Sequence, residues 1–266
     1  MRTTSALTLL ITFLLVGCGS SSRLKYDTPK EAFDQGKTLY DDGKYARAAE
    51  YFQGVFDFGR THEYAADSRL YLARSYYNSR QFLLAANEYQ RFVQIYRNDE
   101  RVVEADFEYA KTFYERSPQY QLDQTDTEAA VRQMQRFVDK YPNSDKVEEA
   151  NGVIVELRQK LAFKQFQSAK LYERRDLYEA AAVSFMEVFD SYPESEWADD
   201  ALLAASKNYI IFADNSIENK KTERYALART YVTRLIQSFP DSPHLDEARE
   251  IDARLEQLAL ATAEKK

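Results

Sequence analysis

Three cations recur along the first half of this 266-residue sequence at a constant spacing, each in the same setting. The cations are Lys37, Arg74 and Lys111; the apolar residues one helical turn earlier are Phe33, Leu70 and Phe107, and the tyrosines three residues later are Tyr40, Tyr77 and Tyr114. A cation forms strong, charge-assisted hydrogen bonds with a carboxylate, and aromatic rings can hold an aromatic side chain. The pattern therefore predicts a groove for an extended peptide that ends in an aromatic residue with a free carboxylate.

A second interpretation of the same residues is purely structural. The tyrosines would then pack between helices, and the cations would pair with neighbouring carboxylates such as Glu31, Asp41, Asp67 or Glu115. Lys170 occupies the equivalent position of a fourth set, which makes the series of cations more informative than any one member. Lys170 is also a candidate for partner contact, together with residues on loops or in the second half of the chain, Tyr120, Leu122, Phe185 and Trp197.

Residues that could support enzyme chemistry are scarce. The chain has two histidines, His62 and His244, and a single cysteine. It contains no HExxH, paired-cysteine or GxSxG pattern, and no glycine-rich loop that would hold a phosphate. The abundant carboxylates fall on helix faces that solvation explains. We therefore expect a protein that is not an enzyme and needs neither a metal nor a cofactor.

The elements that position the cations are predicted by internal repeats of small and aromatic residues. The sets are Gly36, Tyr40, Ala48 and Phe52; Ala73, Tyr77, Ala85 and Tyr89; Ala110, Tyr114, Ala130 and Met134; Ala169, Tyr178, Ala181 and Phe185; and Ala205, Tyr209, Ala228 and Val232. Small residues at two fixed points allow paired helices to approach closely, and the aromatic residues fill the space beside them. This resembles the tetratricopeptide repeat, and it predicts an all-α fold, an α-solenoid of five helix hairpins.

Helix ends are marked by a second recurring phrase, an aromatic residue, proline and then serine. It occurs at Tyr141–Ser144, Tyr192–Ser195 and Phe239–Ser242. Proline ends the preceding helix, and serine is a good N-cap for the next one. Thr28-Pro29-Lys30-Glu31 opens the first repeat in the same way, with a capping box.

Two insertions and one long junction interrupt the repeats. We expect inserted loops at 117–127 and 213–224, and one long helix from about Asp145 to Arg174. That helix joins repeats 1–3 to repeats 4–5, so the sequence predicts a block over 28–143 and another over 144–266.

The N-terminus carries a different signal. An apolar stretch from Ala6 to Val16, too short to span a bilayer, follows Arg2. It ends in Leu15-Val16-Gly17-Cys18, which resembles the lipobox cut by lipoprotein signal peptidase. The resemblance implies a signal peptide over 1–17 and a lipid on Cys18, followed by a flexible tether over 18–27. An ordinary signal peptide with a chance cysteine is the alternative.

The charge balance narrows the range of partners. The chain carries a net charge of −7, whereas binding a nucleic acid backbone requires clustered lysine and arginine. Nucleic acid is therefore not expected as a partner.

A lipobox, a short tether and five such repeats together resemble the BamD family (also called ComL or YfiO). The insertion Ser117–Thr125 followed by Tyr141-Pro142-Asn143-Ser144 is similar to the family's third repeat, and the run from Leu161 to Ala181 is similar to its fourth. Many members carry an arginine at the position matching Phe185, so the partner contact at this point is in doubt.

The resemblance implies a lipid-anchored scaffold on the periplasmic face of the outer membrane. It implies binding to a BamA-like barrel protein, to other assembly lipoproteins and to the C-terminal targeting segments of unfolded outer-membrane proteins. The alternative is a periplasmic repeat adaptor of another envelope system, similar to the Tol–Pal coordinator family or to a regulator of cell-wall enzymes.

Overall fold

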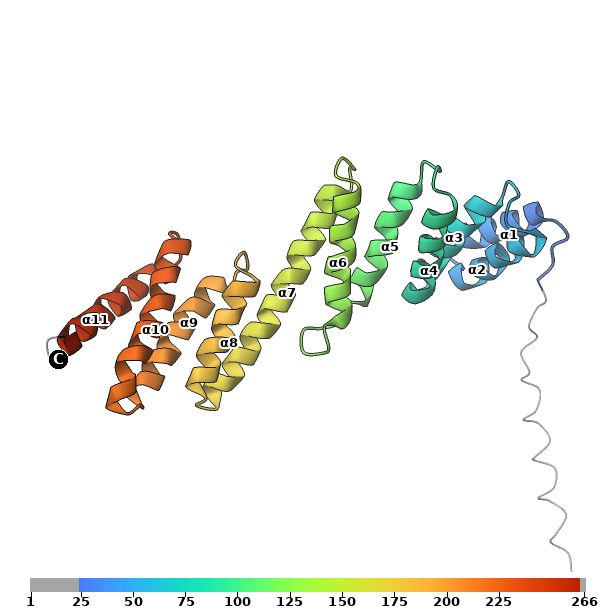
Figure 1. Ribbon diagram of the computed structural model, residues 1–266. Helices are drawn as coiled ribbons and strands as arrows, with labels where there is room; N and C mark the ends of the chain where they lie inside the picture. Colours follow the sequence, from blue (N-terminus) through green and yellow to red (C-terminus); the bar gives the residue numbers. More distant parts are fainter. Residues whose placement is uncertain (1–23, 264–266) are drawn as a thin grey trace, which may run out of the picture. The chain divides into compact units, whose positions relative to one another are not determined.

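The computed structural model describes residues 24–263, and Cys18 lies outside them. The described chain is helical throughout and contains no strand (Figure 1). It divides into two compact units, one ending at Ser79 and the other beginning at Arg80. The expected all-α architecture of helix hairpins is confirmed, while the division at residue 143 stays a prediction about repeat blocks.

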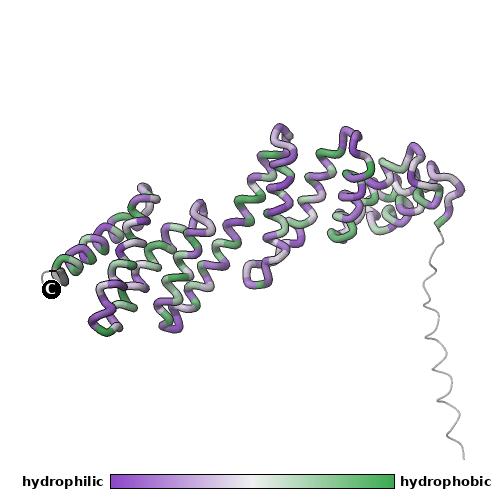
Figure 2. Tube along the Cα trace, viewed as in Figure 1, coloured by the Kyte–Doolittle hydropathy of each residue, from purple (hydrophilic) through white to green (hydrophobic). Residues whose placement is uncertain are grey.

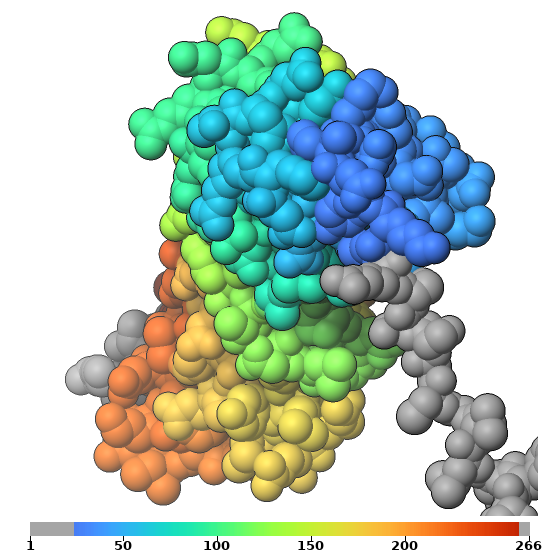
Figure 3. Space-filling view, turned by 90° about the vertical axis from the view of Figure 1, so that its right-hand side faces the viewer, coloured from blue at the N-terminus to red at the C-terminus, as the bar shows by residue number. Residues whose placement is uncertain are grey.

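The first unit consists of three α-helices and a short 3₁₀ helix. They are α1 (Pro29–Asp41), α2 (Tyr45–Gly54), η1 (Val55–Phe58) and α3 (Ala65–Asn78). Thr28 caps α1 as predicted, since its hydroxyl accepts a hydrogen bond from the Glu31 N–H at 3.2 Å. Gly36 is required where α1 meets α2, because a Cβ there would lie 2.8 Å from the Phe52 ring. Figure 3 shows the helices of this unit, in blue to cyan, packed into a continuous surface.

The chain that precedes α1 is held against α2 and η1 by Tyr26. The Tyr26 hydroxyl donates to the Asp57 carboxylate at 2.9 Å, and its ring meets the rings of Tyr51 and Phe58 edge-on at 6.0 Å. Gly54 makes room for it, since a Cβ at that position would collide with the Tyr26 hydroxyl. The folded part of the first unit therefore begins at Tyr26 and not at the start of α1.

The second unit contains eight helices in sequence among its described residues. They are α4 (Phe82–Ile95), α5 (Val102–Arg116), α6 (Thr125–Lys140), α7 (Val147–Arg174), α8 (Tyr178–Ser191), α9 (Ala198–Asp214), α10 (Glu218–Ser238) and α11 (Leu245–Ala263). Each of these helices packs against the next one along the chain. Apolar and polar residues are interspersed along the helices, as the tube in Figure 2 shows. Apolar residues that recur every three to four positions lie on one side of a helix, and that side is buried.

The long helix α7 spans 28 residues and is shared by two hydrophobic clusters, as the sequence predicts. Its first half packs Ala150 and Ile154 against Phe107 and Phe137 of the third hairpin. Its second half packs Ala162 and Phe166 against residues of α8 and α9. Because one unbroken helix belongs to both clusters, the third hairpin of the chain (α5 and α6) is joined to the fourth (the end of α7 and α8) without a flexible linker.

Two local expectations need correction. The serines of the aromatic–proline–serine phrase are not N-caps: α7 begins at Val147, and Ser144 instead lies in the preceding turn, where its hydroxyl accepts from the Lys146 N–H. The expected loop at 213–224 is also wrong, because α9 continues to Asp214 and α10 begins at Glu218. Lys221 pairs with Glu218 within the added turns of α10, and such i, i+3 pairs support a helix.

An ion pair between α7 and the segment before α9 makes stability depend on pH. The Arg158 guanidinium donates to Glu194 at 2.5 Å and holds the pKa of that carboxyl below its usual value. A lowered folded-state pKa contributes stability above the unfolded pKa of about 4.3, and this contribution is lost as pH falls through the folded value. We expect Arg158→Gln to lower the thermal midpoint at pH 7 and the difference from the parent to narrow toward pH 3.

The check is thermal unfolding followed by circular dichroism at several pH values, with Glu194→Gln as the second variant. Glu194→Gln should show the same narrowing, because it removes the same titrating group. Some difference should persist for Arg158→Gln at low pH, because this arginine also donates to the Ser191 carbonyl at 2.9 Å. A difference in thermal midpoint between variant and parent that stays constant from pH 7 to pH 3 would contradict a pH-dependent contribution of the Arg158–Glu194 ion pair.

Candidate functional site

The first two cations of the predicted series meet over one aromatic ring in the first unit. The Lys37 ammonium lies 4.9 Å from the centre of the Tyr71 ring, and the Arg74 guanidinium lies 5.7 Å from it. Lys37 comes from α1, whereas Tyr71 and Arg74 come from α3. Two cations from successive first helices therefore lie near the same ring. The 37-residue spacing does not identify this ring, because the equivalent positions in the first and third repeats are Asp34 and Glu108.

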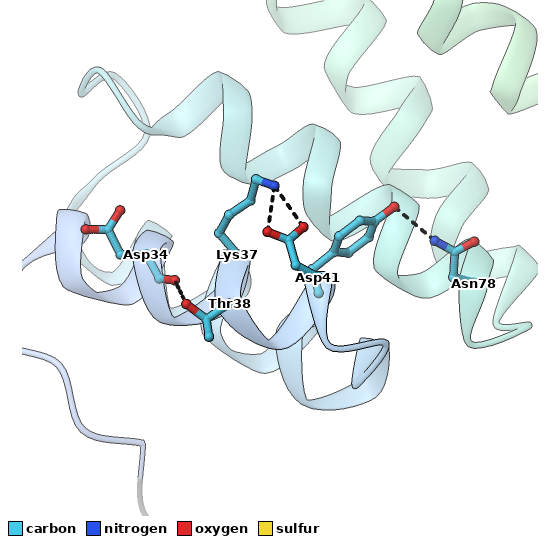
Figure 4. A network of polar contacts seen from close by, with 6 residues as sticks. Asp34, Lys37, Thr38, Asp41 and Asn78 are labelled. Atoms are coloured by element: carbon cyan, nitrogen blue, oxygen red, sulfur yellow. Dashed lines mark hydrogen bonds and ion pairs between the residues drawn. The ribbon is translucent and has the colours of Figure 1, made fainter.

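Lys37 also pairs with a carboxylate on its own helix. Its ammonium donates to the two Asp41 carboxylate oxygens at 2.9 and 3.1 Å (Figure 4), and this hydrogen bond raises the pKa of Lys37. Both side chains are more than a third exposed, and exposed ion pairs of this kind contribute only about 0.2–1 kcal/mol. Lys37 is thus charged at neutral pH and held by a partner that another carboxylate can replace.

Tyr40 fits the structural interpretation of the sequence pattern. Its ring meets Tyr45 and Tyr71 edge-on at 5.2 Å, and its hydroxyl accepts a hydrogen bond from the Asn78 side chain at 3.0 Å. Burial raises the pKa of Tyr40. Its role in the first unit is to link α1 to α3. Tyr77 is half-buried on α3.

Two of the predicted groove residues are core residues. Leu70 and Phe107 are each 1% exposed, so their side chains do not line a groove. Phe33 is half-buried and packs against Phe52, Tyr64 and Tyr71. Leu70 and Phe107 therefore serve the interior and Tyr40 links two helices, which leaves the cations as the main candidates for contact with a peptide.

The third and fourth cations lie in the second unit, and like Lys37 each pairs with a carboxylate on its own helix and lies near an aromatic ring, Phe107 at 5.6 Å from Lys111 and Phe166 at 6.0 Å from Lys170. Lys111 lies 3.7 Å from Glu108 and 3.8 Å from Glu149, and the Tyr114 hydroxyl donates to Glu156 at 3.0 Å. Lys170 pairs with Glu173 at 3.0 Å. The three lysines therefore share the same kinds of neighbour as well as a sequence position, and Lys37 shares the Tyr71 ring with Arg74.

The inserted loop of the third hairpin is fastened to α7. The Tyr120 ring meets the Phe163 ring at 4.7 Å. The Lys160 ammonium donates to the Ser117 hydroxyl at 2.5 Å, and burial lowers its pKa. Lys164 donates to the Leu122 carbonyl at 2.5 Å, while the Leu122 side chain is 59% exposed. The loop is thus a fixed support that presents Leu122 to solvent and folds Tyr120 back onto its own unit.

The remaining partner candidates differ in exposure. Phe185 is fully buried on α8 and meets the Phe166 ring at 5.2 Å, so direct contact of its ring with a partner is ruled out. Trp197 is half-buried and lies between Phe163 and Phe166 of α7, at 4.8 and 5.4 Å. Of these two, only Trp197 reaches the surface, and it does so beside the fastened loop.

Two further findings concern the described residues alone. From residue 24 to residue 263, no three histidine, cysteine, aspartate or glutamate side chains come together in a way that could hold a metal ion. Within the same range, none of the helices has the length and apolar character needed to cross a bilayer.

The comparison with protein families is decisive for the identity of the chain. The family described as "YfiO: Outer membrane lipoprotein" matches residues 25–224. The chain belongs to this family. The resemblance predicted from the lipobox and the five repeats is therefore confirmed, and members of the YfiO family are outer membrane lipoproteins.

Two of the solved structures similar to this YfiO family member are described as TPR proteins. A TPR repeats protein from Bacteroides fragilis has 10% identity and a TM-score of 0.46, covering 88% of this chain and 100% of that one. The TPR2AB domain of yeast Sti1, solved in complex with pHSP90, has 13% identity and a TM-score of 0.41, covering 86% and 98%. A search of curated proteins found no significant match.

Proposed function

We propose that this YfiO family member is a non-catalytic scaffold of the outer-membrane β-barrel assembly machinery. In this proposal it is held at the periplasmic face by lipid on Cys18, binds a BamA-like barrel protein and other assembly lipoproteins, and receives the C-terminal segments of unfolded outer-membrane proteins. Family membership supports the scaffold role and favours it over the alternative of another envelope adaptor. The observation that carries client binding is the pair of cations over Tyr71.

The cation pair suits a peptide carboxylate for a physical reason. Lys37 and Arg74 come from different helices, and both lie within 6 Å of one ring centre. In this proposal one peptide carboxylate beside the Tyr71 ring is held by both cations. The competing Asp41 carboxylate is exposed, and replacing it costs little. A charge-assisted contact to a free C-terminus is stronger than one to a neutral group, so the site should distinguish a free terminus from an amidated one.

For the partner proteins, the second unit offers a different kind of surface. Leu122 is exposed on a loop that is fastened to α7 by Lys164 and, through Tyr120, by Phe163. Exposed apolar side chains on rigidly supported loops favour protein contacts. We assign the BamA-like contact to the surface around Leu122 and Trp197.

Client binding is tested with a fluorescent peptide that ends in phenylalanine, with either a free or an amidated C-terminus. We expect the free form to bind about tenfold more tightly, which corresponds to the loss of one charge-assisted contact. Lys37→Gln and Arg74→Gln should each remove most of this difference, measured by fluorescence anisotropy at low salt.

Lys44→Gln is the matched control, since Lys44 is an exposed lysine of the same unit paired with Asp42 at 3.0 Å but lies in the turn after α1. It should leave the difference between the two peptides unchanged. Equal affinity of the free and amidated peptides, or an unchanged difference in both Lys37→Gln and Arg74→Gln, would exclude carboxylate recognition by this pair.

A further inference from the structure

The outer side of α10 borders a groove that no described helix fills. The groove has a volume of about 760 Å³ and lies between α10 and α11. Its apolar lining includes Tyr225 and Ala226 of α10 and Leu255 and Leu258 of α11. Thr230 and Gln237 of α10 also line it and are exposed. The groove is thus an open trough with an apolar floor, formed by two helices that are both ordered.

The packing of α10 beside α8 and α9 shows what kind of element binds in such a groove. There, α10 packs against α9 and also touches α8, through an ion pair of Arg234 with Asp190 at 3.4 Å. Just after α10, the Phe239 ring meets the Phe189 ring of α8 at 6.0 Å. The second helix of the fifth hairpin therefore lies against its own first helix and against the second helix before it. The equivalent place for the next hairpin is bounded by α11 and α10, which are the two walls of the groove.

The charges of the groove favour one kind of helix. Its lining includes three cations, Lys221, Arg229 and Arg234, and a single carboxylate, Glu218. Helix α10 as a whole has five basic and two acidic residues, whereas α11, the other wall, has two basic and five acidic residues, so the positive charge of the groove lies on its α10 side. The cations pair with carboxylates of their own chain, Arg229 with Asp252 and Glu256 and Lys221 with Glu218, and these partly exposed pairs are weak enough to exchange.

We propose that the groove between α10 and α11 binds an acidic amphipathic helix of a partner protein, which takes the place of the second helix of a sixth hairpin. The apolar stripe of that helix covers Leu258, Ala226 and the Tyr225 ring, and its flanking carboxylates meet Lys221, Arg229 and Arg234. This is the helix-in-groove mode of recognition. It involves α10 and α11 alone, so it is independent of client binding at Lys37 and Arg74.

The test uses two synthetic amphipathic peptides of about 18 residues, a length at which a helix forms readily. Both carry leucine at helical spacing, and they differ only in having glutamate or lysine at the flanking positions. We expect the glutamate peptide to bind at least about tenfold more tightly than the lysine peptide, by fluorescence anisotropy. Thr230→Trp fills the groove from an exposed position and should weaken binding of the glutamate peptide by a similar factor.

Lys221→Glu and Lys220→Glu form the matched pair of variants. Both lysines belong to the first turn of α10 and pair with a glutamate three residues away, but only Lys221 lines the groove. Lys221→Glu should weaken the glutamate peptide several-fold, and Lys220→Glu should not. Thermal midpoints of all variants show that they are folded.

Three results would overturn the proposal. The first is equal binding of the two peptides or no binding of either, and the second is unchanged binding in Thr230→Trp. The third is occupation of the groove by a lipid surface or by a second copy of this chain. It would appear as binding to vesicles containing phosphatidylglycerol, or as self-association in sedimentation. In either case Thr230→Trp and Lys221→Glu would abolish the association, and the glutamate peptide would fail to compete with it.

Discussion

Replacing Phe185 by alanine is expected to lower the free energy of unfolding of the second unit by about 3–5 kcal/mol. The ring is fully buried at the centre of the cluster formed by α7, α8 and α9, where it meets Phe166 and packs among Ala162, Ala181 and Ala205. These neighbours are mostly alanines on helices that are held by other contacts, so they cannot move in to fill the space. Chemical denaturation followed by circular dichroism measures the loss.

Val183→Ala is the control, because Val183 belongs to the same helix but is 44% exposed. It should change stability by less than about 0.5 kcal/mol, as surface substitutions usually do. Phe185→Arg should be at least as damaging as Phe185→Ala, because it would place an unpaired charge in the same space. A folded, stable Phe185→Arg variant would show that the side chain at this position can reach the surface after all, and with it a partner.

Replacing Cys18 by alanine is expected to release the protein from membranes while leaving its fold intact. In the proposed lipoprotein, several acyl chains on one cysteine provide stable anchoring, and none of the described helices could replace them by spanning a bilayer. Among the described residues, the ring and hydroxyl contacts of the first unit begin at Tyr26, eight residues after Cys18. The measurements are membrane fractionation of cells and the thermal midpoint of the purified variant.

Serine and alanine at position 18 should behave alike, because neither carries a thiol to acylate. Retention of the alanine variant in the membrane fraction would mean that protein contacts alone hold the chain there. A lowered thermal midpoint would mean that residue 18 also supports the fold, which would contradict the separation of anchoring from folding.

The hairpins and the long helix α7 were predictable from the sequence because close helix packing leaves a periodic record. Gly36 and Ala169 stand where only a small residue fits, and such positions recur in every hairpin. The same periodicity cannot distinguish the inside of a unit from its surface. Leu70 and Phe107 repeat at the same spacing as Lys37 and Arg74, yet they are buried, because a core stripe and a surface stripe on one helix have the same period.

Contacts between helices are the part that the sequence does not reveal. Tyr71 lies within 6 Å of both Lys37 and Arg74, but the equivalent positions in the first and third repeats are acidic, so no repeat pattern marks it. The sequence also does not reveal that α9 and α10 extend into the region expected to be a loop. An insertion is visible as extra residues, whereas its helical form depends on local pairs such as Lys221 with Glu218 and on the ring of Phe212, which the Arg224 guanidinium covers at 3.7 Å.

Tyr26 also has a consequence for distance. Its ring and hydroxyl fix the chain against α2 and η1, and Tyr26 is eight residues from Cys18, so these eight residues set an upper limit on the distance from the proposed lipid to this fixed point. A fully extended chain covers about 3.3–3.6 Å per residue, so the distance between Cys18 and Tyr26 is at most roughly 26–29 Å. That is about the thickness of the hydrocarbon core of one bilayer. The cation pair on α1 and α3 would therefore search a shallow layer of periplasm next to the membrane, where confinement raises its effective concentration toward any chain arriving there.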